Sequence, residues 1–123
     1  MLAAHWPAAP CVCTEISTTH AVAALTPEPA ALRPGGYISG PTLFAAADAA
    51  LWFLSFGAAN RIMPLALTAD LSIRFLRPAQ GATVYARAEL NKASRRSVIG
   101  TVSVWTADPD QPNATAQGAY ILP

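Results

Sequence analysis

The amino-acid sequence predicts a single α+β domain in which one long central apolar helix is wrapped by a curved antiparallel sheet of about five to six strands. Residues 41–59 form an Ala-rich apolar run of helical length, and residues 65–122 alternate apolar and polar side chains with the period of β-strands. A helix that is apolar on every side has to be enclosed, and a curved sheet can enclose it. The 123 residues suit one domain, 1–123, and residues 1–15 are expected to form an irregular lead-in.

Composition limits the partners and the compartment. Hydrophobic residues make up 53% and charged residues 12% of the chain, so surplus apolar surface predicts burial between subunits. A formal net charge of +1 gives no field that would attract nucleic acid or an anionic membrane. Cys11 and Cys13 are two positions apart in an extended segment, where side chains point to opposite faces and a mutual disulfide is excluded. Two unpaired thiols, and a start without a signal-peptide pattern, predict a cytoplasmic protein.

The long helix has clear start and end signals. Ser39 or Gly40 can cap its first turn, and Pro41 suits the first helical position. Asn60 can end it. A transmembrane span of the same length is the alternative, but Asp48 in its middle, and apolar strand faces that need a core, count against that alternative.

Strands are expected on both sides of this helix in the sequence. Residues 16–25 have a strand pattern with a possible turn near Thr18. Alternation over residues 65–75 predicts a half-buried strand with Leu71 on one face and Thr68 on the other. Three more strands are expected at 82–90, 98–106 and 115–122, with turns at 78–81, 92–96 and 108–112. Their short connections predict an antiparallel meander of consecutive strands.

Asp48 is the only formally charged residue between Arg33 and Arg61. Its helical neighbours are apolar: Phe44, Ala45, Leu51 and Trp52. A carboxylate among such neighbours needs compensating partners, because burying an unpaired charge is costly. Asp48 is therefore the leading candidate for a functional residue, and the alternative is a structural carboxylate that accepts hydrogen bonds from backbone donors.

Four blocks of sequence form a pattern in a fixed order. They are Gly35-Gly36 followed by Ser39-Gly40-Pro41 and Ala46-Ala47-Asp48-Ala49-Ala50, then SIRFLRPA at 72–79, KASRR at 92–96 and ATAQGAYILP at 114–123. Together they resemble the hotdog-fold acyl-CoA thioesterases of the PaaI-like and 4-hydroxybenzoyl-CoA thioesterase-like type. The resemblance extends from near residue 16 to the C-terminus. It departs from the family at 39–41, where most members have His-Gly-Gly.

The resemblance implies hydrolysis of an acyl-CoA thioester to the free acid and coenzyme A. It also implies a homodimer or a dimer of dimers with active sites at the dimer interface. Asp48 matches the family's general base or nucleophile, and Gly40 matches the position whose backbone N–H polarises the thioester carbonyl. Thr68 falls where some relatives of the resembled family carry a Ser or Thr that helps to place the attacking water. Ser39 replaces the family's histidine and cannot supply an imidazole.

The substrate-binding candidates fall into two groups. Apolar candidates for the acyl pocket are Phe44, Leu51 and Trp52, and basic candidates for the coenzyme A phosphates are Lys92, Arg95 and Arg96. No cofactor is expected apart from coenzyme A as part of the substrate, and no metal, because no metal-ligand spacing is present.

Alternatives remain open for each of these residues. Ser39 and Gly40 can be helix caps, Thr68 an ordinary strand threonine, and the basic cluster a solvated turn. Two further functions are compatible with the sequence. One is a hotdog protein that binds acyl-CoA or another apolar ligand without hydrolysing it, and the other is an assembly subunit whose helix serves only oligomer packing.

Overall fold

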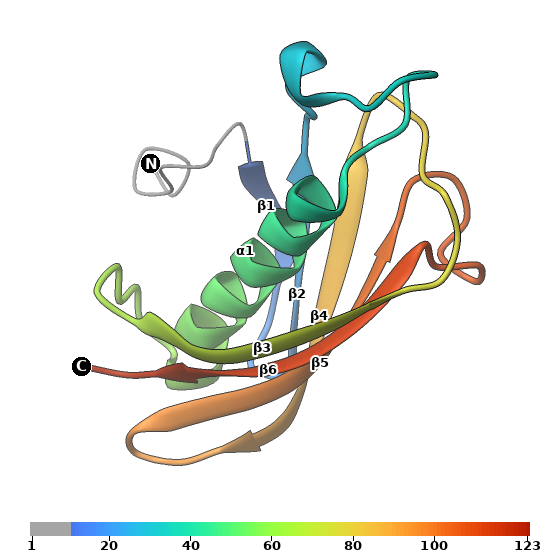
Figure 1. The fold of residues 1–123 in the computed structure, drawn as a ribbon. Helices are drawn as coiled ribbons and strands as arrows, with labels where there is room; N and C mark the ends of the chain where they lie inside the picture. Colours follow the sequence, from blue (N-terminus) through green and yellow to red (C-terminus); the bar gives the residue numbers. More distant parts are fainter. Residues whose placement is uncertain (1–10) are drawn as a thin grey trace.

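A computed structural model describes residues 11–123 of the chain, so what was expected of residues 1–10 lies outside the described part. A single long helix runs along one face of a curved sheet (Figure 1). The elements are β1 (Cys11–Ile16), β2 (His20–Leu25), the 3-10 helix η2 (Pro29–Ala31), α1 (Gly40–Ala59), β3 (Leu67–Phe75), β4 (Val84–Ala93), β5 (Ser97–Trp105) and β6 (Ala114–Ile121).

The six described strands form one antiparallel sheet in the order β1-β2-β4-β5-β6-β3. The predicted meander of consecutive strands is therefore wrong outside β4, β5 and β6, because β3 pairs with β6 and β4 pairs with β2. In this order α1 packs against all six strands. This strand order lets the sheet bury the helix on several sides. The lengths of the loops between strands do not by themselves reveal the order.

The predicted ends of α1 are confirmed to within one residue, since the helix begins at Gly40 and Pro41 is its second residue, not its first. Ser39 is the N-cap, and its Oγ accepts a hydrogen bond of 3.3 Å from the N–H of Thr42. Asn60 ends the helix in the left-handed conformation, with φ of 57°. Asparagine tolerates that conformation better than most residues, which explains why it stands there.

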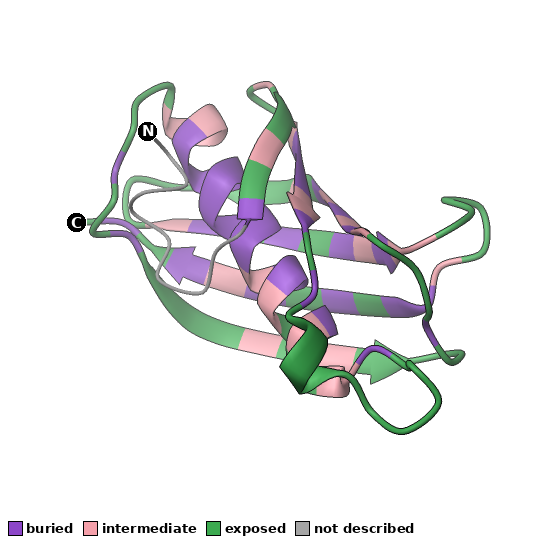
Figure 2. Cartoon of the chain, turned by 90° about the horizontal axis from the view of Figure 1, so that it is seen from above, coloured by how far each residue is buried: buried purple, intermediate pink, exposed green. Residues whose placement is uncertain are grey.

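The helix forms the core of the fold (Figure 2). By length and a mean hydropathy of 1.4, α1 could cross a membrane, but 61% of its apolar window is buried inside the chain. Gly100 and Gly118 are cross-strand partners beneath it. A Cβ on Gly100 would lie 3.0 Å from Cδ2 of Leu54 and 3.1 Å from Cδ2 of Leu51, so the missing side chain lets the sheet approach α1 closely. The predicted central helix is confirmed.

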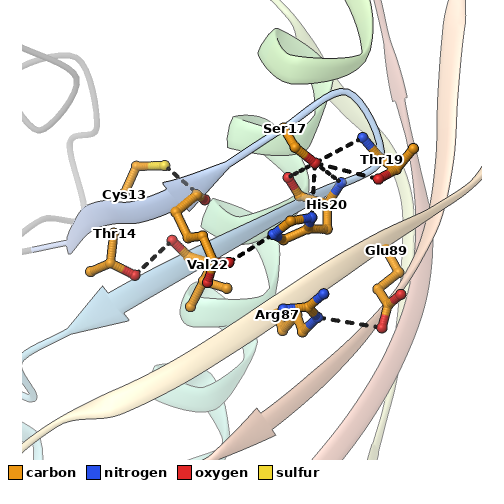
Figure 3. Close-up of polar contacts among 9 residues, drawn as sticks. Cys13, Thr14, Ser17, Thr19, His20, Val22, Arg87 and Glu89 are labelled. Carbon is orange, nitrogen blue, oxygen red and sulfur yellow. Dashed lines mark hydrogen bonds and ion pairs between the residues drawn. The ribbon is translucent and has the colours of Figure 1, made fainter.

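The N-terminal hairpin differs in part from the expectation. The turn near Thr18 is confirmed, but Cys11–Ile16 form β1 and are not irregular, because they pair with β2. The turn is held by Ser17, whose Oγ accepts from the N–H groups of Thr19 and His20 at 3.1 Å (Figure 3). His20 Nε2 lies 3.0 Å from Oε1 of Glu15. His20 thus has a structural role in this hairpin.

A bulge in β3 changes which residues face the helix. Thr68 pairs with Tyr120, whereas Asp70 pairs with Ala119, so Ala69 is an extra residue. Directly paired residues share one face of a sheet. Tyr120 is 2% exposed and points inward, and Thr68 points inward with it. The predicted placement of Thr68 on the face opposite Leu71 is wrong, because a bulge shifts the alternation by one.

The prediction that β3 is half-buried is also wrong for the single chain. Only Leu71 and Ile73 are partly covered, and the other side chains of β3 are exposed. Leu67 is 69% and Phe75 is 53% exposed. β3 lies at an edge of the sheet, where one row of backbone groups has no neighbouring strand.

Candidate active site

Asp48 lies in the middle of α1, partly buried, and its carboxylate is held by two hydroxyl groups. Thr68 Oγ1 donates to Asp48 Oδ1 at 2.7 Å, and the Tyr120 hydroxyl donates to the same oxygen at 2.6 Å. The Tyr120 hydroxyl is also 3.2 Å from the backbone carbonyl oxygen of Asp48. The partly buried Asp48 carboxylate therefore has the hydrogen-bond partners that the sequence predicted it would need, and they come from β3 and β6.

Local structure explains why these three residues meet. The bulge at Ala69 turns Thr68 toward the helix, and the inward position of Tyr120 follows from the alternation of β6. Burial, and next the hydrogen bond to Asp48, raise the pKa of Tyr120 above its ordinary value of 10. The phenol therefore stays protonated and remains a hydrogen-bond donor throughout the neutral range.

The second oxygen of the carboxylate, Oδ2, has no hydrogen-bond donor in the described part of the chain. The neighbouring Thr68 is exposed. Thr68 has given its only hydrogen to Asp48, so toward a water molecule it can act only as an acceptor. This arrangement suits a carboxylate that removes a proton from water or attacks an electrophilic carbon.

Among residues 40–43, the first turn of α1, one backbone N–H has no acceptor within the described chain. Pro41 has no N–H, and the N–H groups of Thr42 and Leu43 bond to the carbonyl oxygen of Ser39 at 3.1 and 3.2 Å. The N–H of Gly40 has no acceptor within the described chain. Ser39 acts as the cap, as its alternative interpretation predicted. The positive end of the helix dipole lies at the same place, which suits stabilisation of a developing oxyanion.

A hollow of about 390 Å³ lies next to Gly40. Its lining is mainly apolar: Ile38, Gly40, Leu43, Phe75, Leu76, Arg77, Pro78 and Ala79. A Cβ on Gly40 would lie 3.1 Å from the ring of Phe75, so any larger residue would fill part of this space. Phe44, one turn further along α1, is 37% exposed.

The other two apolar candidates lie in the core. Leu51 is 0% and Trp52 is 3% exposed. The indole ring of Trp52 meets the ring of Phe56 edge-on, with centroids 4.7 Å apart. Of the three predicted pocket residues, Phe44 alone is open to solvent in the single chain.

The three basic candidates are exposed, and one of them lines a hollow at the far end of the helix. This hollow has a volume of about 410 Å³ and lies between Arg61 and Arg95. Small and apolar residues form the rest of it: Ala58, Ala59, Met63, Ala93, Ser94, Val98 and Leu122. Arg61 was not predicted as a binding residue. Its position just after the helix could have indicated a basic side chain close to the end of α1.

These features do not all meet in one chain. Gly40 and Asp48 are eight residues apart on one helix, which separates them by about 12 Å along its axis. Ala59, beside the hollow between the two arginines, is about 16 Å beyond Asp48. Within residues 11–123, no group of three or more His, Cys, Asp or Glu residues could hold a metal ion.

The family model described as the thioesterase superfamily matches residues 35–113. The chain therefore belongs to the thioesterase superfamily, and the family resemblance of the sequence blocks is confirmed. This membership supports thioester hydrolysis as the general activity. A search of curated proteins returned no match.

Solved structures agree with this result. A candidate thioesterase from Silicibacter is 26% identical with a TM-score of 0.78, covering 92% of this chain and 78% of its own. The PaaI protein of the Escherichia coli phenylacetic acid degradation operon is 19% identical with a TM-score of 0.78, covering 98% and 88%. A conserved Pseudomonas aeruginosa protein is 19% identical with a TM-score of 0.80, covering 98% of each chain. The predicted hotdog fold is confirmed.

Proposed function

We propose that this protein hydrolyses an acyl-CoA thioester to the free acid and coenzyme A in the cytoplasm. The observation that carries this proposal is the Asp48 carboxylate, held through Oδ1 and open at Oδ2, in a chain of the thioesterase superfamily. An oxygen without a protein donor, on a side chain that is only partly buried, can bond to a water molecule or to a substrate. The open oxygen supports the catalytic role.

The proposed reaction uses water. Oδ2 of Asp48 takes a proton from a water molecule whose second hydrogen is accepted by Thr68 Oγ1. The oxygen of that water forms a bond to the thioester carbon, and the carbonyl oxygen becomes an oxyanion near a Gly40 N–H. The C–S bond then breaks, and the proton on Asp48 passes to the departing thiolate. Direct attack by Oδ2 would instead break the C–S bond, release the coenzyme A thiolate and form an anhydride, which a water molecule then hydrolyses to the free acid and the Asp48 carboxylate.

The 12 Å separation along the helix supports a site shared between two protomers. Asp48 is hydrogen-bonded to Thr68, and the ring of Phe75 lies next to the space that a Cβ on Gly40 would occupy, so the two parts of the site lie at opposite ends of β3. A twofold axis near Phe44, midway between Gly40 and Asp48, would bring the two parts together. The same axis would pair β3 of one protomer antiparallel with β3 of its partner.

The exposed surface around β3 fits such a pairing. Its free edge can accept a second strand, and large apolar side chains at and next to its ends are exposed in the single chain: Leu65, Leu67, Phe75 and Leu76. Phe44 on α1 is exposed as well. The proposed unit is a homodimer, or a dimer of two such dimers. We assign the acyl group to the apolar hollow beside Gly40 and the coenzyme A phosphates to Arg95, Arg96 and Lys92, with Arg61 added.

Ser39 and Pro41 are the residues that distinguish this site from its relatives. With Pro41 lacking an N–H and Thr42 and Leu43 bonded to Ser39, Gly40 has the one N–H of residues 40–43 that no acceptor of the described chain occupies, and we assign the oxyanion to it. One donor of this kind typically contributes a factor of about 10²–10³ in rate. A protein that binds acyl-CoA and releases it unchanged is the second candidate, favoured by the same departures.

A panel of acyl-CoA thioesters with a thiol-trapping reagent tests both candidates. The wild-type protein should release thiol from at least one aromatic or medium-chain acyl-CoA, and Asp48→Asn should abolish that release while keeping the fold. Asp70→Asn is the matched control, since Asp70 is an exposed carboxylate on β3 beyond the bulge. Saturable binding without thiol release would favour the second candidate, and an Asp48→Asn protein with wild-type turnover would exclude Asp48 as the catalytic group.

A further inference from the structure

Of the two side chains within residues 11–123 that are hydrogen-bonded to Asp48, Tyr120 is the less exposed. It is 2% exposed and lies on β6, which has a neighbouring strand on each side, whereas Thr68 is exposed on the edge strand β3. Its hydroxyl reaches the side chain of Asp48 at 2.6 Å and the backbone carbonyl of the same residue at 3.2 Å. Tyr120 is thus fixed to α1 at the point where the carboxylate leaves the backbone.

We propose that Tyr120 is a positioning residue, which holds Oδ1 of Asp48 so that Oδ2 is the oxygen that acts on water or on the thioester. This inference rests on the proposed thioesterase function. It assigns a role to a residue at which the substrate itself makes no contact, because the phenol is buried beneath the helix.

The geometry favours this role over simple packing. The carboxylate of an aspartate rotates easily about its last torsion, because that torsion has a broad, roughly twofold preference. One donor on Oδ1 leaves the plane of the carboxylate loosely defined. Two donors from different strands, Thr68 and Tyr120, converge on Oδ1 and direct Oδ2 away from both.

The chemistry of the phenol points the same way. Burial raises the pKa of Tyr120, so its oxygen keeps its hydrogen and cannot compete with Asp48 as a base. That hydrogen is directed at Oδ1, because the distance to the backbone carbonyl is longer by more than half an ångström. Tyr120 therefore orients the Asp48 carboxylate, and Oδ2 of Asp48 accepts the proton.

Kinetics of Tyr120→Phe on a hydrolysed acyl-CoA test the proposal. Because small misplacements of a reacting group can cost about 10²-fold, we expect kcat to fall about 10- to 100-fold while KM stays within about twofold. Tyr85→Phe is the matched control, since Tyr85 stacks on Trp105 on the outer face of the sheet and should leave kcat unchanged. A Tyr120→Phe protein with wild-type kcat, or with a loss confined to KM, would overturn the proposal.

A combination of variants separates positioning from packing. Thr68→Val should also lower kcat, and the double variant Thr68→Val/Tyr120→Phe should lose less than the product of the two single effects, because both donors act on one oxygen. Independent, multiplicative losses would contradict a shared action on Oδ1. Equal melting temperatures of Tyr120→Phe and Tyr85→Phe would show that the kinetic loss is not due to unfolding.

A crystallographic measurement needs no substrate and separates this proposal from the proposed function. The wild-type protein should have one orientation of the Asp48 carboxylate, and Tyr120→Phe should have a rotated or divided one. An unchanged orientation in Tyr120→Phe would overturn the positioning role even if the enzyme is active. Absence of turnover by the wild-type protein, with the orientation changed as expected, would contradict only the proposed function.

Discussion

Asp48 lies two helical turns beyond Gly40, about 12 Å along the axis of α1, so the two cannot act on the same carbonyl group within one chain. A dimer in which each site takes Asp48 from one protomer and Gly40 from its partner removes this difficulty. Mixed dimers test it directly. Co-expressed Asp48→Asn and Gly40→Val chains should regain activity, because one of the two sites in each mixed dimer then has both wild-type residues.

The expected recovery is about half the activity of a wild-type dimer. Each variant alone should be inactive or nearly so, since a side chain at Gly40 would meet the ring of Phe75 and fill the space beside the N–H. Separately tagged chains and two-step purification isolate the mixed dimers. Mixed dimers that are as inactive as the parents would mean that both residues serve one chain's own site.

Arg95 and Arg61 flank a hollow about 16 Å along the helix from Asp48. If this hollow takes the phosphates of coenzyme A, Arg95→Ala should raise KM for acyl-CoA about three- to tenfold, with kcat nearly unchanged, because an exposed charged contact contributes uniform binding. A thioester of N-acetylcysteamine lacks phosphates and should show no such change. Arg74→Ala, on the outer face of β3, is the control. An equal KM change with both thioesters would contradict phosphate binding.

Gly57 faces the backbone of the β1–β2 turn, and a Cβ there would collide with the carbonyl oxygen of Ser17. At an exposed helical site, Gly→Ala stabilises by about 1 kcal/mol. Here backbone overlap should reverse the sign, so Gly57→Ala should lower the free energy of unfolding by about 1–3 kcal/mol. Urea unfolding measures it. A Gly57→Ala protein as stable as wild type would mean that the turn moves away at no cost.

The fold could be predicted from the sequence where local signals decide it. Ser39, Pro41 and Asn60 mark the helix ends through backbone chemistry that acts within a few residues. The strand order could not be predicted. β3 and β4 follow each other in the sequence, and the short connection between them suggests a hairpin, yet they are not neighbours in the sheet. The bulge at Ala69 could not be predicted either, because the alternation of apolar and polar residues does not show where an extra residue is inserted.

The site was predicted in part for the same reason. Asp48 is conspicuous as a lone charge in an apolar helix, and Thr68 was proposed by resemblance although its alternation placed it on the wrong face. Tyr120 was missed as a site residue, since an aromatic ring on the inner face of a strand usually belongs to the core. Its hydroxyl group was the feature that could have indicated a site residue, because a buried tyrosine hydroxyl needs a hydrogen-bond partner.

The buried phenol of Tyr120 also predicts how stability depends on pH. Its pKa is raised in the folded protein, first by burial and next by its hydrogen bond to Asp48, whereas in the unfolded chain a tyrosine ionises near its ordinary value of 10. Folding then keeps a proton that the unfolded chain loses. The resulting stabilisation is fully present below pH 10 and is lost as the pH rises further, by about 1.4 kcal/mol per pH unit.

Urea unfolding at pH 8, 10 and 11 measures this dependence in wild type and in Tyr120→Phe. The buried Cys11, whose pKa burial raises to about 12, adds a similar decline from about pH 9 in both proteins, so the difference between them isolates Tyr120. Tyr120→Phe should lose stability less steeply above pH 10 than wild type. If the slopes of Tyr120→Phe and wild type coincide, the phenol is not held in its protonated form by the fold.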